Sequence, residues 1–206
     1  MESVWLKHNG HNDLIVVFGG WALGAEMFAH LSGPQDVLFV DDYRDLDGLP
    51  DLSSYQNRTA VAYSFGVSAF AHLCPAERAQ FDRTVAINGS PSPVDRRMGI
   101  PPMVYQKTQN GMSQENFQSF AALCYGEKQP DIAIDVAART EELAAVRQRG
   151  PASCPTFDRI WISQKDRIFP PANLARAFCG QEDVIRSIDA PHVPFSAWDS
   201  WQEVIA

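Results

Sequence analysis

The sequence has no hydrophobic run long and continuous enough to cross a membrane. Its longest apolar stretch, Leu14 to Ala29, is interrupted by three glycines and by Glu26, whereas a membrane-spanning helix needs about 20 apolar residues. The first 13 residues, MESVWLKHNGHND, carry neither the basic start nor the apolar segment of a secretion signal. We therefore expect a cytoplasmic protein that does not associate with membranes.

Patterns for metals, disulfides and phosphate loops are absent as well. Cys74, Cys124, Cys154 and Cys179 are widely scattered and form no CxxC pair, which argues against a zinc site. Without a secretion signal, a disulfide framework is not expected either. The phosphate-binding pattern G-x-x-x-x-G-K-[ST] does not occur. The sequence therefore predicts no metal and no other cofactor.

Positive charge is scarce, with 17 Lys and Arg against 25 Asp and Glu and a formal net charge of −8. The overall field therefore opposes binding to nucleic acid or to an anionic membrane. A hydrophobic fraction of 45% and a charged fraction of 20% are ordinary for a globular protein. At 206 residues, we expect one domain over 1–206.

Short apolar segments alternate with longer segments of helical character. The expected strands are 14–18, 37–40, 60–63, 84–88, 159–163 and 184–188, with a further edge strand around Trp5. Several are apolar at almost every position, which is typical of strands buried on both faces of a parallel sheet. The expected helices are 24–31, 66–73, 75–81, 114–124, 132–149, 171–178 and 198–206. This alternation predicts an α/β fold with a mostly parallel sheet flanked by helices.

Residues 91–155 interrupt the alternation. They contain proline-rich pieces at 90–93 and 101–102 and two of the expected helices, but no good strand. Open α/β sheets place their sites beyond the carboxyl ends of the strands. We expect this segment to form a small helical cap inserted over those ends.

The sequence Ala62-Tyr63-Ser64-Phe65-Gly66 lies between an expected strand and an expected helix. A nucleophile elbow needs this context, because a tight strand-to-helix turn exposes the serine hydroxyl and small residues on either side avoid clashes. Ala62 stands where glycine is commoner, so the match to G-x-S-x-G is imperfect. Ser64 is the candidate nucleophile.

A second pattern, Val17-Phe18-Gly19-Gly20-Trp21, ends the first strong strand. Such glycines let the backbone turn toward a site and offer an amide to a developing oxyanion. The expected oxyanion donors are the amides of Trp21 and Phe65. The alternative is a Gly-Gly turn beside a buried tryptophan.

Two further residues follow late strands. Asp166 is placed to orient a base, although it could instead cap the helix that begins at Pro171; Asp158 and Asp189 are less suitably placed. His192 is the only one of five histidines in a loop beyond a strand end. The chain order Ser64, Asp166, His192 is that of the α/β-hydrolases. Together these residues predict a catalytic triad that hydrolyses an acyl group.

The motifs at 18–21, 63–67 and 192–195 resemble those of the BioG-type carboxylesterases, and the likeness covers nearly the whole chain. The resemblance implies an α/β-hydrolase that removes the methyl ester from pimeloyl-acyl carrier protein in biotin synthesis, a role similar to that of BioH. The likeness leaves the oligomeric state open. Two alternatives also remain: another acyl hydrolase, such as a thioesterase or short-chain esterase, and a non-catalytic binding protein of the same fold.

An acidic carrier would need basic residues near the entrance of the site. The expected cap offers six of them, and we take three as candidate carrier contacts: Arg139, Arg147 and Arg149. Arg139 and Arg147 are eight residues apart, so a straight helix brings them to roughly one face. The other reading is a solvated helix face, because Glu141 and Glu142 lie among them. Phe117, Phe120 and Tyr125 could line an acyl channel or pack the cap onto the body; a packing role is favoured for any one of them.

Overall fold

The computed structural model describes residues 1–206, which are organised around one seven-stranded sheet in the order β1-β3-β2-β4-β5-β6-β7. The strands are β1 (Glu2–Lys7), β2 (Asp13–Phe18), β3 (Asp36–Asp41), β4 (Asn57–Tyr63), β5 (Arg83–Ile87), β6 (Arg159–Ser163) and β7 (Ile185–Ile188). β1 runs antiparallel to β3, and every other neighbouring pair is parallel. The mostly parallel sheet is confirmed, including the edge strand that contains Trp5.

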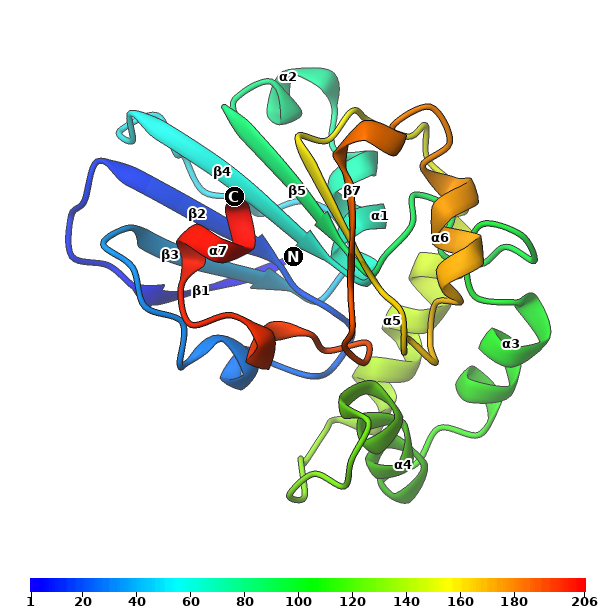
Figure 1. Ribbon diagram of the computed structural model, residues 1–206. Coiled ribbons are helices and arrows are strands. Elements are labelled where there is room, and N and C mark those ends of the chain that lie inside the picture. The colour runs from blue at the N-terminus through cyan, green and yellow to red at the C-terminus, as the bar shows by residue number, and fades with distance from the viewer.

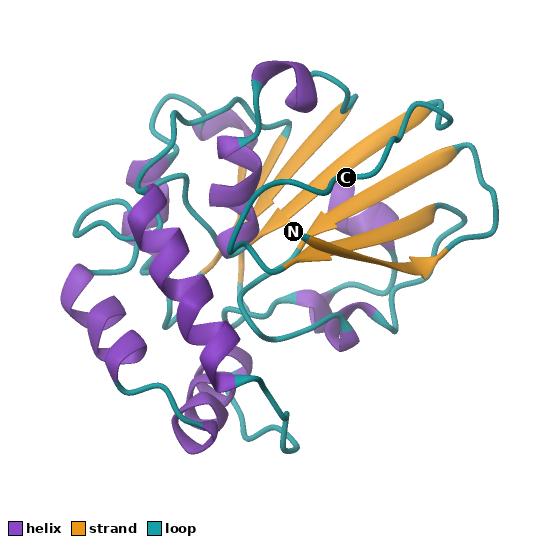
Figure 2. Cartoon of the chain, turned by 180° about the vertical axis from the view of Figure 1, so that it is seen from behind, coloured by secondary structure: helices purple, strands orange, loops and turns teal.

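Seven α-helices accompany the sheet. They are α1 (Phe65–His72), α2 (Pro75–Arg78), α3 (Pro102–Asn110), α4 (Gln114–Tyr125), α5 (Val136–Arg149), α6 (Pro171–Ala177) and α7 (Trp201–Ile205). Figures 1 and 2 show α1 and α7 on opposite faces of the sheet. The indole of Trp161 in β6 donates to the Val204 carbonyl at 2.9 Å, which fastens α7 to its face. None of the helices combines the length and apolarity that crossing a membrane would demand.

The central strands are apolar at consecutive positions because both of their faces are covered. In β2, every residue from Leu14 to Phe18 is at most 1% exposed. An alternating sequence here would bury a polar side chain on one face without a partner. The hydrophobic pattern of the chain therefore specifies the sheet directly.

Residues 91–155 carry α3, α4 and α5, which lie beyond the carboxyl ends of β2, β4 and β5 (Figure 1). The sequence predicts two helices here but not α3, because Pro101 and Pro102 are typical of a loop. Pro102 is instead the first residue of α3. Proline suits that position, since its φ is already helical and its missing N–H would have no partner there.

The helix expected at residues 24–31 is wrong. Only a short 3₁₀ turn, η1 (Glu26–Phe28), forms in this segment. Ala22 and Gly24 have positive φ angles of 60° and 67°, which break the approach to a helix. The following amides bond three residues back instead of four, while the buried side chains of Met27 and Phe28 hold the turn against the core.

Candidate active site

Ser64 lies in the turn between β4 and α1 with φ 56° and ψ −120°, a conformation that non-glycine residues rarely adopt. Its amide donates to the Ile87 carbonyl at 2.9 Å. A Cβ at Gly66 would lie 2.0 Å from the Phe18 carbonyl oxygen, so only glycine permits this crossing of helix and strand. Ala62 is fully buried in β4 and fits its position without glycine.

A continuous hydrogen-bond chain joins Ser64 to His192 and Asp166. His192 Nε2 lies 3.0 Å from Ser64 Oγ, and His192 Nδ1 lies 2.8 Å from Asp166 Oδ2. The other carboxylate oxygen of Asp166 accepts the amides of Ile168 and Phe169 at 2.7 and 2.9 Å. All three side chains are buried. Two amides and an imidazole therefore fix the carboxylate in one orientation.

The position of Asp166 differs from that of a helix cap. α6 begins after Pro170 without any side-chain cap. The two other aspartates that were considered serve elsewhere: Asp158 accepts the Thr84 amide at 2.7 Å, and Asp189 pairs with Lys165 at 2.8 Å on the surface. Of the three, only Asp166 reaches the imidazole of His192.

The loop that carries His192 is held from two sides. The Val193 amide donates to the Cys124 carbonyl in α4 at 2.9 Å, and Asn88 Nδ2 donates to the His192 carbonyl at 2.8 Å. Asn88 also bonds the Ser163 amide and hydroxyl at 2.8 and 2.7 Å, so it joins the ends of β5 and β6 to the histidine loop. Sequence reasoning missed this role because it treated Asn88 as the last residue of a strand. The signal in the sequence is a carboxamide at the end of an apolar run, directly before Gly89.

Tyr63 and Phe169 enclose the His192 ring, with centroid separations of 5.2 and 5.9 Å. The Tyr63 hydroxyl is fully buried and makes no hydrogen bond within the protein. Burial raises the pKa of Tyr63 well above its usual value. Tyr63 is therefore neutral near pH 7, and its ring serves as an apolar wall beside the imidazole.

The two residues of the expected oxyanion donors, Trp21 and Phe65, line the same cavity as Ser64. A Cβ at Gly20 would be 3.2 Å from Ser64 Cβ, so the 19–21 loop packs directly against the serine. Neither the Trp21 nor the Phe65 backbone N–H donates a hydrogen bond within the protein. Phe65 is the first residue of α1, where an amide has no helical partner. These N–H groups are the kind of donor that an oxyanion requires.

A cavity of about 110 Å³ opens beside Ser64. Nine of its 12 lining residues are hydrophobic, and they come mainly from the 19–21 loop and from α3, α4 and α5. The lining is Trp21, Ser64, Phe65, Ile100, Val104, Tyr105, Thr108, Phe120, Leu123, Leu143, Arg167 and Ile168. The site is therefore an apolar cavity next to a serine hydroxyl, with one cation, Arg167, on its wall. No group of His, Cys, Asp and Glu side chains is arranged to hold a metal ion.

The aromatic residues of α4 have different surroundings. Phe120 lines the cavity and packs against Trp21 with a centroid separation of 5.0 Å. Phe117 is fully buried and also contacts the Trp21 ring, at 5.9 Å. Tyr125 is half-buried against the core at the end of α4. Of these three, only Phe120 touches the cavity.

The three arginines of α5 also differ in their contacts. Arg139 pairs with buried Glu142 at 2.7 Å, and Arg149 donates to the Tyr43 carbonyl at 2.7 Å. Arg147 is exposed and forms no ion pair. Only Arg147 therefore has its guanidinium free for another molecule.

The family of sequences described as Pimeloyl-ACP methyl esterase BioG matches residues 1–204. The chain belongs to the BioG family. The crystal structure of BioG from Haemophilus influenzae is 25% identical, covers 100% of both chains and has a TM-score of 0.87. A hydrolase from Pseudomonas aeruginosa is 13% identical over 95% of this chain and 88% of that chain, with a TM-score of 0.64. The predicted α/β-hydrolase fold is confirmed.

A curated relative carries a different name. The malonyl-[acyl-carrier protein] O-methyltransferase of Bacteroides fragilis is 30% identical over 192 residues, which are 87% of this chain. The chain spans 39% of the length of that protein. The similarity therefore concerns a part of the larger chain.

Proposed function

We propose that this BioG family protein is a serine esterase that hydrolyses the methyl ester of a pimeloyl group carried on acyl carrier protein. The observation that carries the proposal is the chain Asp166–His192–Ser64, which ends at an apolar cavity beside two unpaired amides. These groups match the parts that acyl transfer needs: Ser64 as nucleophile, His192 as base, Asp166 as the carboxylate that orients the base, and the two amides as the oxyanion site.

Acylation begins when Ser64 Oγ attacks the ester carbonyl carbon while His192 Nε2 takes the hydroxyl proton. Asp166 accepts the Nδ1–H, which selects the tautomer with a free Nε2 and stabilises the imidazolium. The Trp21 and Phe65 amides receive the carbonyl oxygen as it becomes negative. Collapse of the tetrahedral intermediate breaks the bond to the methoxy oxygen, which leaves as methanol with the proton from His192.

Deacylation follows the same steps with water as the nucleophile in place of Ser64. His192 takes a proton from the water as its oxygen attacks the acyl-serine, and the same amides hold the second oxyanion. The intermediate collapses, Ser64 recovers its proton from His192, and the pimeloyl group leaves with a free terminal carboxylate while still attached to the carrier. No cofactor takes part in either half of this proposed reaction.

The cavity suits an aliphatic acyl chain, since nine of its 12 lining residues are hydrophobic. Next to the cavity, α3 exposes Met103 at 81% and Lys107, and Val104, which lines the cavity, is itself 54% exposed. No acidic residue lies between Arg96 and Glu115, although the whole chain is acidic. This apolar and locally basic entrance suits an acidic carrier protein. Of the α5 arginines, Arg147 remains the best candidate to add to it.

The name of the Bacteroides fragilis relative does not weaken the esterase proposal. The match covers only 39% of that protein, so the residues responsible for its methyltransferase activity can lie in the part that this chain does not match. The side chains brought together in the present site are those of acyl transfer, whereas a methyl-group donor would need a binding site of its own.

The test compares Ser64→Ala with Ser68→Ala, a buried serine one turn further along α1. Ser64→Ala should lower kcat on pimeloyl-carrier methyl ester by about 10⁴-fold or more and abolish labelling by a fluorophosphonate, while Ser68→Ala retains both. Hydrolysis of short p-nitrophenyl esters and of acyl thioesters is measured separately for comparison. Turnover of thioesters alone would overturn the methyl ester assignment, and a folded protein that takes no label would indicate a binding protein.

A further inference from the structure

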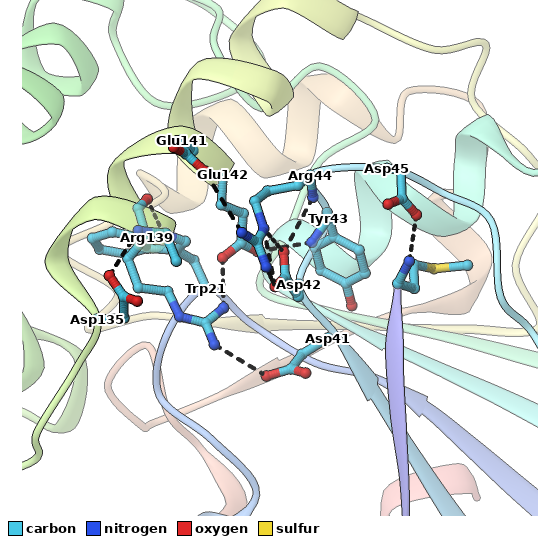
Figure 3. A network of polar contacts seen from close by, with 12 residues as sticks. Trp21, Asp41, Asp42, Tyr43, Arg44, Asp45, Asp135, Arg139, Glu141 and Glu142 are labelled. Carbon is cyan, nitrogen blue, oxygen red and sulfur yellow. Dashed lines mark hydrogen bonds and ion pairs between the residues drawn. The ribbon is translucent and has the colours of Figure 1, made fainter.

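Helix α5 reaches across to the loops that follow β2 and β3. Figure 3 shows Arg139 and Glu142 of α5 pointing toward Asp41 and Tyr43 at the end of β3, with the Trp21 ring beside the backbone of α5. We call this set of contacts the α5 anchor; its members are Trp21, Tyr43, Arg139, Glu142 and Arg149. The anchor matters because Trp21 and its neighbour Gly20 form the wall against Ser64.

The first connection in the α5 anchor is direct. The Trp21 indole Nε1 donates to the Arg139 carbonyl at 3.0 Å, and Trp21 is only 3% exposed. The residue that offers its backbone amide to the oxyanion is thus bonded through its side chain to α5. The Arg139 guanidinium in turn binds Glu142 Oε2 at 2.7 Å and lies 4.0 Å from Asp41.

The second connection runs through Tyr43, which is fully buried. Its hydroxyl lies 2.9 Å from the Gly19 carbonyl and 3.1 Å from the Val40 carbonyl, and donates to these oxygens. Its backbone amide donates to Glu142 Oε1 at 3.1 Å, and its carbonyl accepts from Arg149 at 2.7 Å. Tyr43 therefore transmits the position of α5 to Gly19, at the start of the same loop.

Glu142 is the group on which both connections converge. It is 1% exposed, and burial raises its pKa although Arg139 and the Tyr43 amide act to lower it. A buried ion pair is seldom more stabilising than a well-packed apolar pair, so stability alone is a weak reason to place one here. Directional bonds from one carboxylate to two partners fix a geometry that an apolar contact would leave adjustable.

We propose that Glu142 and Arg139 are positioning residues, which hold the 19–21 loop against α5 so that the Trp21 amide faces the developing oxyanion at Ser64. The inference rests on the proposed esterase function. It predicts a loss in kcat with little change in KM, because an oxyanion forms only after the substrate has bound. A misplaced donor should cost about 10- to 100-fold in kcat.

Glu142→Gln and Glu141→Gln form the matched pair of variants, since Glu141 is the next residue but its side chain is 68% exposed. Steady-state kcat and KM are measured on a p-nitrophenyl ester, with active enzyme counted by fluorophosphonate labelling of Ser64. Inhibition by a trifluoromethyl ketone, which forms an oxyanion on Ser64, is measured alongside. Glu142→Gln should lower kcat and weaken the inhibitor by a similar factor, whereas Glu141→Gln should change neither by more than about twofold.

The double variant Arg139→Met, Glu142→Leu separates positioning from stability. Replacing a buried pair by apolar residues commonly preserves the fold, and thermal unfolding reports whether it does here. A stable double variant whose kcat and inhibitor affinity remain low supports the proposal, and one with wild-type values overturns it. If the wild-type protein itself neither hydrolyses esters nor takes the label, the proposed function fails instead, so the two failures are distinguishable.

Discussion

At the scale of single residues, backbone strain collects along one edge of the sheet. The non-glycine residues with positive φ are Ala22, Asp42, Ser64 and Asn88. They follow β2, β3, β4 and β5 in turn, so all four lie toward the carboxyl ends of parallel strands. Strained residues persist where surrounding contacts determine them, and such positions are commonly functional. Three of the four are Ser64, the candidate nucleophile; Ala22, which directly follows the 19–21 loop; and Asn88, which supports the His192 loop.

Tyr63 and Tyr43 are both fully buried, but only the Tyr43 hydroxyl forms hydrogen bonds. Removing the two hydroxyls should therefore change the free energy of unfolding differently. Tyr63→Phe removes a hydroxyl without a hydrogen bond and should leave the free energy of unfolding unchanged or raise it by up to about 1 kcal/mol. Tyr43→Phe removes the contacts to Gly19 and Val40 and should lower it by about 1 to 2 kcal/mol. Urea denaturation measures both, and a larger loss for Tyr63→Phe than for Tyr43→Phe would contradict this account.

At the scale of elements, the sequence predicted strands better than the short helices. Strands β2 to β6 each contain three to five consecutive apolar residues, nearly all of them buried. This pattern reflects burial on both faces of the sheet. The α3 sequence, PMVYQKTQN, has only one buried residue, Tyr105, and it begins with proline. Its helical state depends on the proline at its first position and on the Tyr105 hydroxyl bond to the Leu143 carbonyl at 2.8 Å. That partner is 38 residues away, beyond the reach of local patterns.

The exposed face of α3 carries a prediction about the carrier. Lys107→Glu reverses a charge outside the cavity and should raise KM for the carrier-bound ester by about 10-fold, with kcat on a p-nitrophenyl ester unchanged. Raising the salt concentration should reduce the difference in KM between Lys107→Glu and the wild type, because salt screens exposed charges. Arg186→Glu is the control, since Arg186 lies on β7 and bonds only the carbonyls of Asp183 and Ile185. An equal effect of both variants would show a general charge effect instead of docking on α3.

At the scale of the whole molecule, the two ends of the sheet have different tasks. The candidate site lies at the carboxyl ends of the strands. The amino ends carry buried polar side chains that bind neighbouring loops, such as Asp36 at the start of β3. Asp36 is fully buried and accepts the Asn9 and Gly10 amides and the Tyr55 hydroxyl at 2.8, 3.1 and 3.0 Å. Burial alone would raise the pKa of Asp36, but these hydrogen bonds outweigh it and lower the pKa below 3.8.

Asp36→Asn should therefore affect stability and its pH dependence, but not catalysis. A lowered folded-state pKa means that the stabilisation is present above the unfolded-state pKa of Asp36 and is lost as the pH falls through the lower, folded-state pKa. The variant should lose about 1 to 3 kcal/mol of unfolding free energy at pH 7 and show a flatter decline in acid. Asp51→Asn, which alters an exposed aspartate bonded only to Ser53, should differ little from wild type. Denaturation across pH, with kcat measured in parallel, tests both statements.

The sequence by itself determined the class of fold and the identity of the three candidate catalytic residues. Runs of apolar residues specify buried parallel strands, and the short motifs around Ser64 and His192 are local because a strand-to-helix turn and a strand-end loop are local structures. Ser64, Asp166 and His192 also follow one another in the chain in the order that the α/β-hydrolase fold requires.

Only the tertiary structure decided how the site is supported. The bonds from Asn88 to the His192 loop and from α5 to Trp21 and Tyr43 join residues about 100 or more positions apart. The same packing turned Arg139 and Arg149, which looked like exposed carrier contacts, inward onto Glu142 and Tyr43. Whether an arginine faces solvent or a buried carboxylate depends on which element covers it, and that is settled only when the chain has folded.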